Sequence, residues 1–307
     1  MLRSWIERAR MRFAPPVCGL AIGRDYIGLA RLSSADGGLQ VQELAETRLE
    51  SKLFAGIPDA QTTAALTVAL KTVATVIAGR YLPVHVSLPD AAVRLEVFEL
   101  DELPKGQAAQ QELTHWRFTR DAGNGTPTVS ASQELGRDGD KYLLLGLAVD
   151  EAWRRCIAEA LAQAGIVAWS LSANACRQFN RYHDSLAAGS GALAVLSMDA
   201  WALLLWDEQG RVRYARSRWR TVADDHAAIA AEVERSILAY AHGAPNRSVQ
   251  RVHVVAEGAD AGLVTTLDAR LREPCLRLSV DAGLEYAPDV NRGFGSAGLS
   301  LAAALER

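Results

Sequence analysis

A pattern of predicted elements that occurs twice constrains this chain more than any other feature of its sequence. The first copy has an apolar strand over residues 17–22, a turn at Gly23-Arg24-Asp25 and a returning strand over residues 26–32. A third strand, a helix and a further strand over residues 84–88 follow. These elements form one α/β unit, because the helix can cover a face of the sheet that the strands build.

The second copy starts at Ala192 and has the same order. Its hairpin turns at Asp199-Ala200 and is followed by a third strand, a helix and a final strand, over residues 212–219, 229–240 and 252–256. The two copies share turn lengths and order but negligible sequence identity, so the repeat is one of pattern. We predict a duplicated α/β fold with two halves. The alternative is a pair of unrelated α/β units.

Between the two copies lies a segment with an α+β pattern of its own. Residues 92–100 alternate in polarity as a strand does, and a helix follows Pro104. Two further strands are predicted over residues 129–135 and 142–149, and a helix over residues 150–165 ends the segment. We therefore predict a small inserted subdomain over residues 92–165.

Composition excludes several classes of function. Of the 307 residues, 49% are hydrophobic and the formal net charge is −3, so the overall electrostatics do not favour a nucleic-acid partner. The 4 cysteines and 6 histidines are scattered without metal-binding or redox spacing. No apolar run approaches the roughly 18 residues of a membrane span, and no secretory signal is recognisable. We expect a cytoplasmic protein.

The first 16 residues predict a short amphipathic, basic helix. Apolar side chains lie on one stripe at helical spacing and arginines surround it: Leu2, Trp5, Ile6, Ala9 and Phe13, with Arg3, Arg8, Arg10 and Arg12. Pro15-Pro16 ends the segment. Such a helix suits an anionic membrane surface or a groove on a partner. The alternative is that the stripe docks on the core of this protein.

Five short segments occur in an order and spacing that a known family shares. They are GLAIG at 19–23, VSLP at 86–89 leading to Leu103-Pro104, EVERSILAY at 232–240, RVHVVAEGAD at 251–260 and AGLSL at 297–301. In this order the chain resembles the PilM-type proteins of type IV pilus assembly, and among them the MshI-like branch of mannose-sensitive haemagglutinin pilus systems. The resemblance covers essentially the whole chain.

The resemblance implies an actin-like fold: a duplicated β-β-β-α-β-α unit whose two halves enclose a cleft, with a small inserted α+β subdomain. The expected organisation is an N-terminal helix over 1–16, a first half over 17–91 and 166–190, the inserted subdomain over 92–165, a second half over 191–292 and a closing helix over 293–307.

The resemblance also implies a partner and a location. In the family, the cytoplasmic N-terminal tail of a PilN-type inner-membrane protein lies against the inserted subdomain where it meets the first half. Here that place would involve the strand Ala92–Leu100 or its neighbours. We therefore expect a protein on the cytoplasmic side of the inner membrane, peripheral to it. Self-association is left open.

An actin-type ATP site needs two hairpin turns whose glycines let backbone N–H groups approach phosphate, an aspartate for the magnesium water shell, and a glycine-rich loop for adenosine. Here the first turn has Ala21 where the resemblance implies aspartate. It keeps Gly23, but Arg24 and Asp25 follow, and Asp25 is expected on the wrong face. The second turn has Asp199 without a glycine, and the third keeps Gly258 beside an acid.

Together these changes predict that nucleotide binding is weak or lost, and that no cofactor is needed. The alternative is a working protein that binds ATP and magnesium and whose partner binding depends on the nucleotide. Other enzyme classes are not supported, because the chain has no P-loop, no nucleophile elbow and no histidine-bearing catalytic set.

A third hypothesis concerns the Arg211–Arg220 stretch, which holds five arginines and no acid. Alternation along a strand puts Arg211 and Arg213 on one face and the other three on the opposite face, which divides the basic patch. A strand whose arginines pair with acids elsewhere is therefore favoured over anion or nucleic-acid binding. Taken together, the sequence predicts a non-catalytic actin-like scaffold of a type IV pilus assembly platform.

Overall fold

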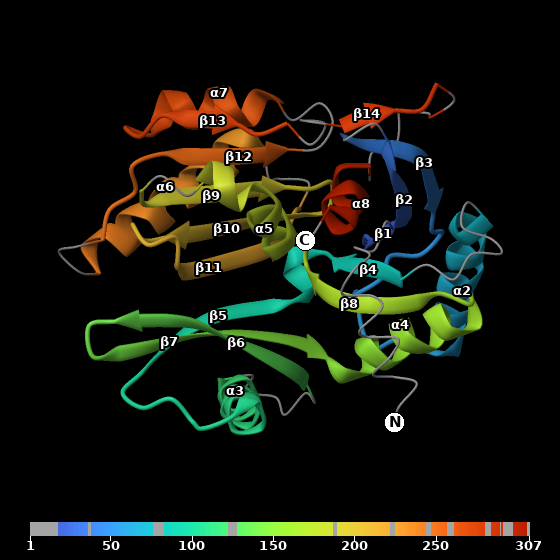
Figure 1. Ribbon diagram of the computed structural model, residues 1–307, viewed down its shortest axis with the longest axis horizontal. Helices are drawn as coiled ribbons and strands as arrows, with labels where there is room; N and C mark the ends of the chain where they lie inside the picture. The colour runs from blue at the N-terminus through green and yellow to red at the C-terminus, as the bar shows by residue number, and fades with distance from the viewer. Residues whose placement is uncertain are drawn as a thin grey trace.

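The computed structural model describes residues 18–35, 38–75, 83–121, 128–186, 189–221, 225–243, 247–256, 261–279, 284–288, 290 and 297–305 (Figure 1). These residues form three β-sheets with helices on their faces, a mixed α/β architecture as predicted. The predicted helix over residues 1–16, with Leu2, Arg3, Trp5, Ile6, Arg8 and Phe13, lies outside the described residues. None of the described helices is long and apolar enough to cross a membrane.

The first sheet has the strand order β14-β3-β2-β1-β4-β8. Its strands are β1 (Cys18–Ile22), β2 (Tyr26–Ala35), β3 (Gly38–Arg48), β4 (Pro83–Leu88), β8 (Val167–Ala173) and β14 (Leu284–Tyr286). Strands β1, β2 and β3 are antiparallel, which confirms the predicted hairpin with its third strand. Strand β4 is parallel to β1, and β8 is parallel to β4 and forms one edge of the sheet.

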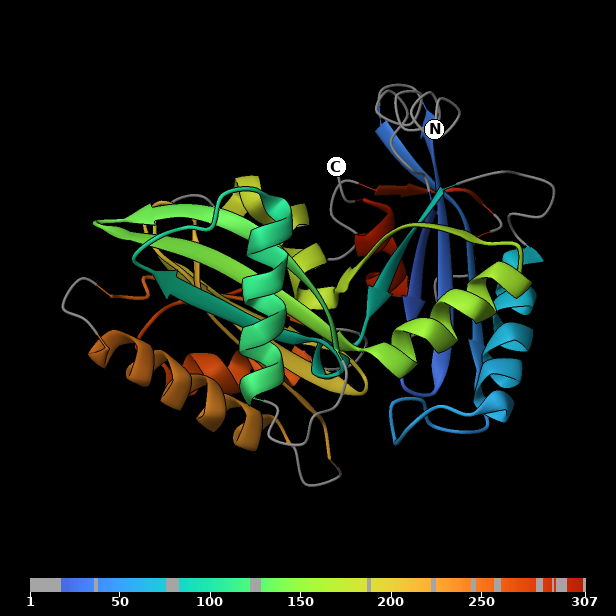
Figure 2. The same cartoon turned by 90° about the horizontal axis from the view of Figure 1, so that it is seen from below.

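Helices α2 (Ala60–Ala74) and α4 (Glu151–Gln163) pack side by side over one face of the first sheet (Figure 2). Each helix begins at an aspartate, Asp59 or Asp150, whose carboxylate accepts backbone N–H groups of the first turn. Helix α8 (Ala297–Ala304) lies on the other face. It is so close to β1 that a Cβ on Gly19 would lie 2.0 Å from the Ser300 carbonyl oxygen, so only glycine fits there.

The second sheet repeats this order. Its strands are β9 (Gly191–Leu196), β10 (Ala200–Trp206), β11 (Val212–Trp219), β12 (Val252–Ala256) and β13 (Cys275–Arg277), arranged as β11-β10-β9-β12-β13. Helices α6 (His226–His242) and α7 (Ala261–Arg270) cover one face, and α5 (Asn174–Leu186) packs against the other. An antiparallel hairpin with a third strand and a parallel strand beside it thus occurs in both halves, as the sequence pattern predicts.

The third sheet is the core of the inserted segment. It is antiparallel in the order β5-β7-β6, with β5 (Arg94–Leu100), β6 (Thr128–Asp138) and β7 (Lys141–Asp150). A short 3-10 turn, η2 (Asp90–Ala92), precedes β5. Helix α3 (Gln107–Asp121) crosses one face (Figure 2), where Phe118 packs on Phe98 and Leu144. The opposite face of this sheet is directed toward the two halves and lines a groove between them.

Two elements lie elsewhere than the predicted boundaries suggest. Helix α4, predicted within the inserted segment, packs against α2 because Ile157, Ala160 and Leu161 join the core of the first half. Strand β14, predicted within the second half, pairs in parallel with β3 of the first. In both cases the element packs with the first half, although the predicted boundaries place it elsewhere.

Candidate functional site

The first candidate site is the place where the two predicted phosphate turns meet. The β1–β2 turn is closed by a hydrogen bond from Gly23 N–H to the Tyr26 carbonyl, at 2.8 Å. The β9–β10 turn is closed in the same way, from Ser197 N–H to the Ala200 carbonyl at 2.9 Å. We call these two facing turns the turn junction. The structure therefore brings together Gly23, Arg24, Asp25 and Asp199, whereas Gly258 lies outside the described residues.

A direct hydrogen bond joins the two turns. The backbone N–H of Arg24 donates to Oδ2 of Asp199 at 2.5 Å, across 175 residues of chain. Asp25 is turned to Arg48, with its Oδ1 3.3 Å from Nη1. The Asp199 carboxylate thus takes up one of the N–H groups of the first turn, the kind of group that holds phosphate in an anion-binding turn.

Side chains fill the space beside these turns. Tyr26 is fully buried and packs with Ala21 and Met198, which come from opposite halves. A Cβ placed on Gly23 would lie 2.2 Å from the Tyr26 ring. Arg48 lies over the outer side of that ring and contacts the Met198 sulfur. Sequence reasoning did not identify Tyr26 or Met198, because their placement depends on how the two hairpins approach each other.

An aromatic stack continues the contact outward from the turn junction. The Arg24 guanidinium lies 5.1 Å from the centre of the Trp219 ring, which belongs to the second half. Trp219 stacks on Phe54 at 5.9 Å, and Phe54 contacts Trp153 of α4 at 4.6 Å. Phe54 has a φ of 59°, a conformation that non-glycine residues rarely adopt. The two halves are therefore joined by packing as well as by the Arg24–Asp199 hydrogen bond.

Buried carboxylates surround the turn junction. Asp90 is buried below the N-terminus of α5, and its Oδ1 accepts the Ala175 N–H at 2.6 Å. Burial raises the pKa of Asp90 to about 7, and the nearby Asp199 adds to that rise. Burial also raises the pKa of Asp199, although the Arg24 N–H opposes the shift. Within the described residues, no group of three or more His, Cys, Asp or Glu side chains is placed to hold a metal ion.

The second candidate site is a groove along β6, one of the two edge strands of the third sheet. One hollow of about 120 Å³ is lined by Val93, Val129, Ser130, Ala131, Leu147, Val149, Arg154, Leu171 and Ser172. A second, of about 390 Å³, is lined by Gln133, Glu134, Leu135, Leu145, Leu147, Ser172, Cys176, Phe179, Asn180, His183, Leu204, Gly210, Arg211 and Val212. The two hollows share Leu147 and Ser172. We call them together the β6 groove.

The β6 groove has walls from all three sheets. Its floor is the face of the third sheet opposite α3, and its sides come from β8 and α5 and from β10 and β11. Both β6 and β8 are edge strands of their sheets. Val129 is 39% exposed and Leu171 is 37% exposed, which is high for apolar strand residues. Groove residues 129–135 of β6 would extend over about 20 Å at ordinary strand rise.

The predicted strand Ala92–Leu100 contributes little to this groove. Strand β5 lies beside β11 of the second half, where Glu99 Oε1 accepts Arg213 Nη2 at 2.8 Å. Only Val93, which precedes β5, lines the groove. The inserted sheet also meets the first half through β5 and β7, since Leu95 and Leu147 pack against the core of that half and Val93 belongs to it. In the sequence, the apolar residues of V-A-W-S-L-S at 167–172 were the pattern that could have indicated strand β8 and its part in the groove.

The five arginines in and beside β11 divide between two faces, as expected from their spacing. Arg211 and Arg213 pair with Asp138, Asp207 and Glu99. On the other face, Arg216 and Arg218 pair with Glu232, and Arg220 donates to the Ser197 carbonyl at 2.9 Å. All five guanidinium groups thus contribute to contacts within the protein.

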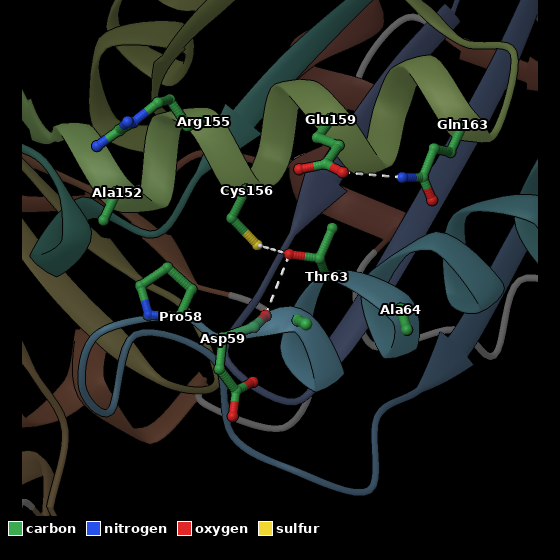
Figure 3. Close-up of a pocket in the computed structure, with 10 residues that line it drawn as sticks. Pro58, Asp59, Thr63, Ala64, Ala152, Arg155, Cys156, Glu159 and Gln163 are labelled. Carbon is green, nitrogen blue, oxygen red and sulfur yellow. Dashed lines mark hydrogen bonds between the residues drawn. The ribbon is translucent and has the colours of Figure 1, made fainter.

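A third hollow of about 510 Å³ lies between α2 and α4 (Figure 3). The Thr63 hydroxyl lies 3.3 Å from the Cys156 sulfur and 3.2 Å from the Asp59 carbonyl oxygen. Burial raises the pKa of the Cys156 thiol, so the sulfur stays protonated at neutral pH. A protonated thiol is a poor nucleophile, and this hollow therefore offers no activated cysteine.

Comparisons with known proteins identify the fold. The sequence matches no protein-family profile and no curated protein. A chain of a PilM-PilN type IV pilus biogenesis complex is similar in structure, with a TM-score of 0.71 and 17% identity over 95% of this chain and 97% of that chain. A Bacteroides thetaiotaomicron protein with an actin-like ATPase fold and unknown function has a TM-score of 0.53 and 10% identity, over 85% and 90%. The chain therefore has the actin-like fold that its resemblance to the PilM-type proteins implies.

Proposed function

We propose that this protein is a non-catalytic scaffold of a type IV pilus assembly platform, and that it holds the N-terminal tail of a PilN-type inner-membrane protein. The observation that carries the proposal is the β6 groove, whose lining combines apolar and polar side chains and which is bordered by two edge strands. Structural similarity to a chain of a PilM-PilN complex supports it. The MshI-like branch, and a location on the cytoplasmic side of the inner membrane, are the finer parts of the same proposal.

The chemistry of the β6 groove suits an extended peptide. An edge strand offers backbone N–H and C=O groups to a further strand, and pockets beside it select alternate side chains. The apolar wall formed by Val129, Leu147 and Leu171 would take aliphatic side chains of the tail. A tail that lies along β6 would contact the inserted sheet and both halves at once. Recognition of this kind needs no chemical step.

The turn junction supports the absence of nucleotide chemistry. Tyr26 and Met198 occupy space beside the two turns, and Asp199 takes the Arg24 N–H. The Asp199 carboxylate beside the Arg24 N–H would also repel a phosphate chain. The alternative, a protein that binds ATP and magnesium and releases or takes up its partner accordingly, requires these groups to move apart.

The predicted helix over residues 1–16 is a second part of the proposal. Its apolar stripe and its arginines would give a weak contact with an anionic membrane surface. A tail held in the β6 groove and a helix on the lipid would act together, because two weak attachments reinforce each other.

A thermal-shift titration tests the proposed function. The purified protein is titrated with a synthetic PilN-type tail peptide, with a scrambled peptide of the same composition, and with Mg-ATP. A ligand that binds only the folded state raises the melting temperature by mass action. We expect the tail peptide to raise the melting temperature, and the scrambled peptide and Mg-ATP to leave it unchanged. No rise with the tail, or a rise with millimolar Mg-ATP, would contradict the proposed scaffold.

A further inference from the structure

Asp199 contacts the first turn as a ligand would. Its Oδ2 accepts the Arg24 N–H at 2.5 Å, immediately after Gly23, where the backbone of the turn is accessible from the second half. A turn N–H that the hairpin does not use can hold an anion, and here the Gly23 N–H is bonded to the Tyr26 carbonyl whereas the Arg24 N–H is offered to the second half. We propose that the Asp199 carboxylate is a built-in ligand of the first turn, and that it latches the two halves together without a bound anion.

The second turn holds this carboxylate in place. The Ser197 hydroxyl lies 3.2 Å from Oδ1 of Asp199, so both carboxylate oxygens have contacts. The Asp199 carbonyl accepts the Arg220 N–H at 2.8 Å, which ties the turn to the end of β11. The side chain is therefore oriented by its own half before it meets the other half. Pre-organisation of this kind lowers the entropic cost of the contact.

The charges around the latch favour the internal carboxylate over an external anion. The acids near Asp199 are Asp25, which pairs with Arg48, and Asp90, which caps α5. The nearby cations are already engaged: Arg24 lies over Trp219, and Arg220 donates to the Ser197 carbonyl. An anion from solution would have to displace Asp199 and then lie beside it.

Other contacts across the junction are consistent with a fixed arrangement of the halves. The Ser217 hydroxyl of β11 donates to the Asp90 carbonyl at 2.9 Å, and Trp219 stacks on Phe54. Arg48 of β3 contacts the Met198 sulfur. The latch is thus one polar bond within a closed interface, and its loss should expose the first turn locally without unfolding either half.

Amide hydrogen exchange tests the latch directly. We compare the wild type with Asp199→Ala, which removes the acceptor, and Asp199→Asn, which keeps a carbonyl oxygen without the charge. Asp225→Ala is the matched control, because Asp225 also accepts a backbone N–H, that of Ala228, but within one half. Exchange is followed in peptides that cover residues 22–29, well below the melting temperature of every variant.

We expect exchange in residues 22–29 to become about ten- to a hundredfold faster in Asp199→Ala, since a hydrogen bond to a charged acceptor is lost. Asp199→Asn should fall between Asp199→Ala and the wild type, and Asp225→Ala should leave these residues unchanged. Equal exchange in Asp199→Ala and Asp225→Ala would overturn the latch.

A measurement on the wild type needs no variant. Inorganic phosphate at tens of millimolar, compared with chloride at equal ionic strength, should leave exchange in residues 22–29 unchanged, because Asp199 occupies the turn. Slower exchange with phosphate would show that an external anion reaches the turn, and would overturn the proposal. Neither experiment involves the tail peptide, so this inference and the proposed scaffold function can fail separately.

Discussion

The turn junction and the β6 groove are both places where sheets of this protein meet, yet one is filled and the other is open. At the turn junction, Tyr26 and Met198 pack together and Asp199 reaches the backbone of the opposite half. In the β6 groove, Val129 and Leu171 remain more than a third exposed. The turn junction is thus a packed contact between the two halves, whereas the β6 groove leaves apolar side chains accessible beside the inserted sheet.

The largest expected effect on stability comes from removing the Tyr26 ring from the turn junction. Tyr26→Ala removes a fully buried ring between the two turns, and a cavity of this kind costs about 3–5 kcal/mol of the free energy of unfolding. Urea denaturation followed by tryptophan fluorescence measures the loss. Tyr26→Phe is the control, because it keeps the ring and should retain most of the stability. A loss below about 1 kcal/mol in Tyr26→Ala would mean that the junction is loosely packed.

A second prediction concerns the charge beside the turn junction. Because the pKa of Asp90 is raised to about 7 in the folded protein, folding takes up a proton between about pH 4 and pH 7. The contribution of Asp90 to stability is therefore present at low pH and lost as the pH rises toward 7. In the variant Asp90→Asn, the amide oxygen would accept the same Ala175 N–H without titrating.

The difference in unfolding free energy between the wild type and Asp90→Asn should accordingly fall by on the order of 3 kcal/mol from pH 4 to pH 7 and stay level above it. Denaturation at a series of pH values measures it. His85, whose pKa burial lowers to about 4, has the opposite effect, since its contribution is lost as the pH falls from 6.5 to 4. His85 is present in both proteins, so it cancels in the difference. A constant difference would contradict the buried position of Asp90.

A substitution at Leu171 tests the β6 groove and should change the stability of the protein least. Leu171→Glu puts a charge into the β6 groove and should weaken binding of the tail peptide about ten- to a hundredfold, with little change in the melting temperature. Leu238→Glu is the control, because Leu238 is 50% exposed on α6, away from the groove. Titration calorimetry measures the affinity of the tail peptide for each variant. Equal affinities in the two variants would place the tail elsewhere.

Much of the fold could be predicted because hydrophobic periodicity is local. The hairpins, the third strands and the main helices of both halves follow from alternation and from helical spacing within short windows. The assignment of α4 and β14 to the first half could not be predicted, because it depends on which sheet completes their apolar faces. From their neighbours in the sequence, α4 was assigned to the inserted segment and β14 to the second half.

Some residues of the candidate sites could likewise be selected from the sequence, whereas the contacts between them could not. Gly23, Arg24, Asp25 and Asp199 could be selected because a phosphate turn requires particular residue types at particular positions. The hydrogen bond between Arg24 and Asp199 could not, because it joins residues 175 positions apart. Leu171 could not be selected from the sequence because an apolar strand residue is usually buried, whereas this one lines an open hollow and is 37% exposed.

The order of the elements, the duplication and the departure of both turns from a phosphate-binding pattern thus follow from residue types within a few positions. Which junction is closed and which is open follows only from the packing of the whole chain. That distinction depends on how three sheets pack, because burial and hydrogen bonding across the turn junction and the β6 groove are set by residues far apart along the chain.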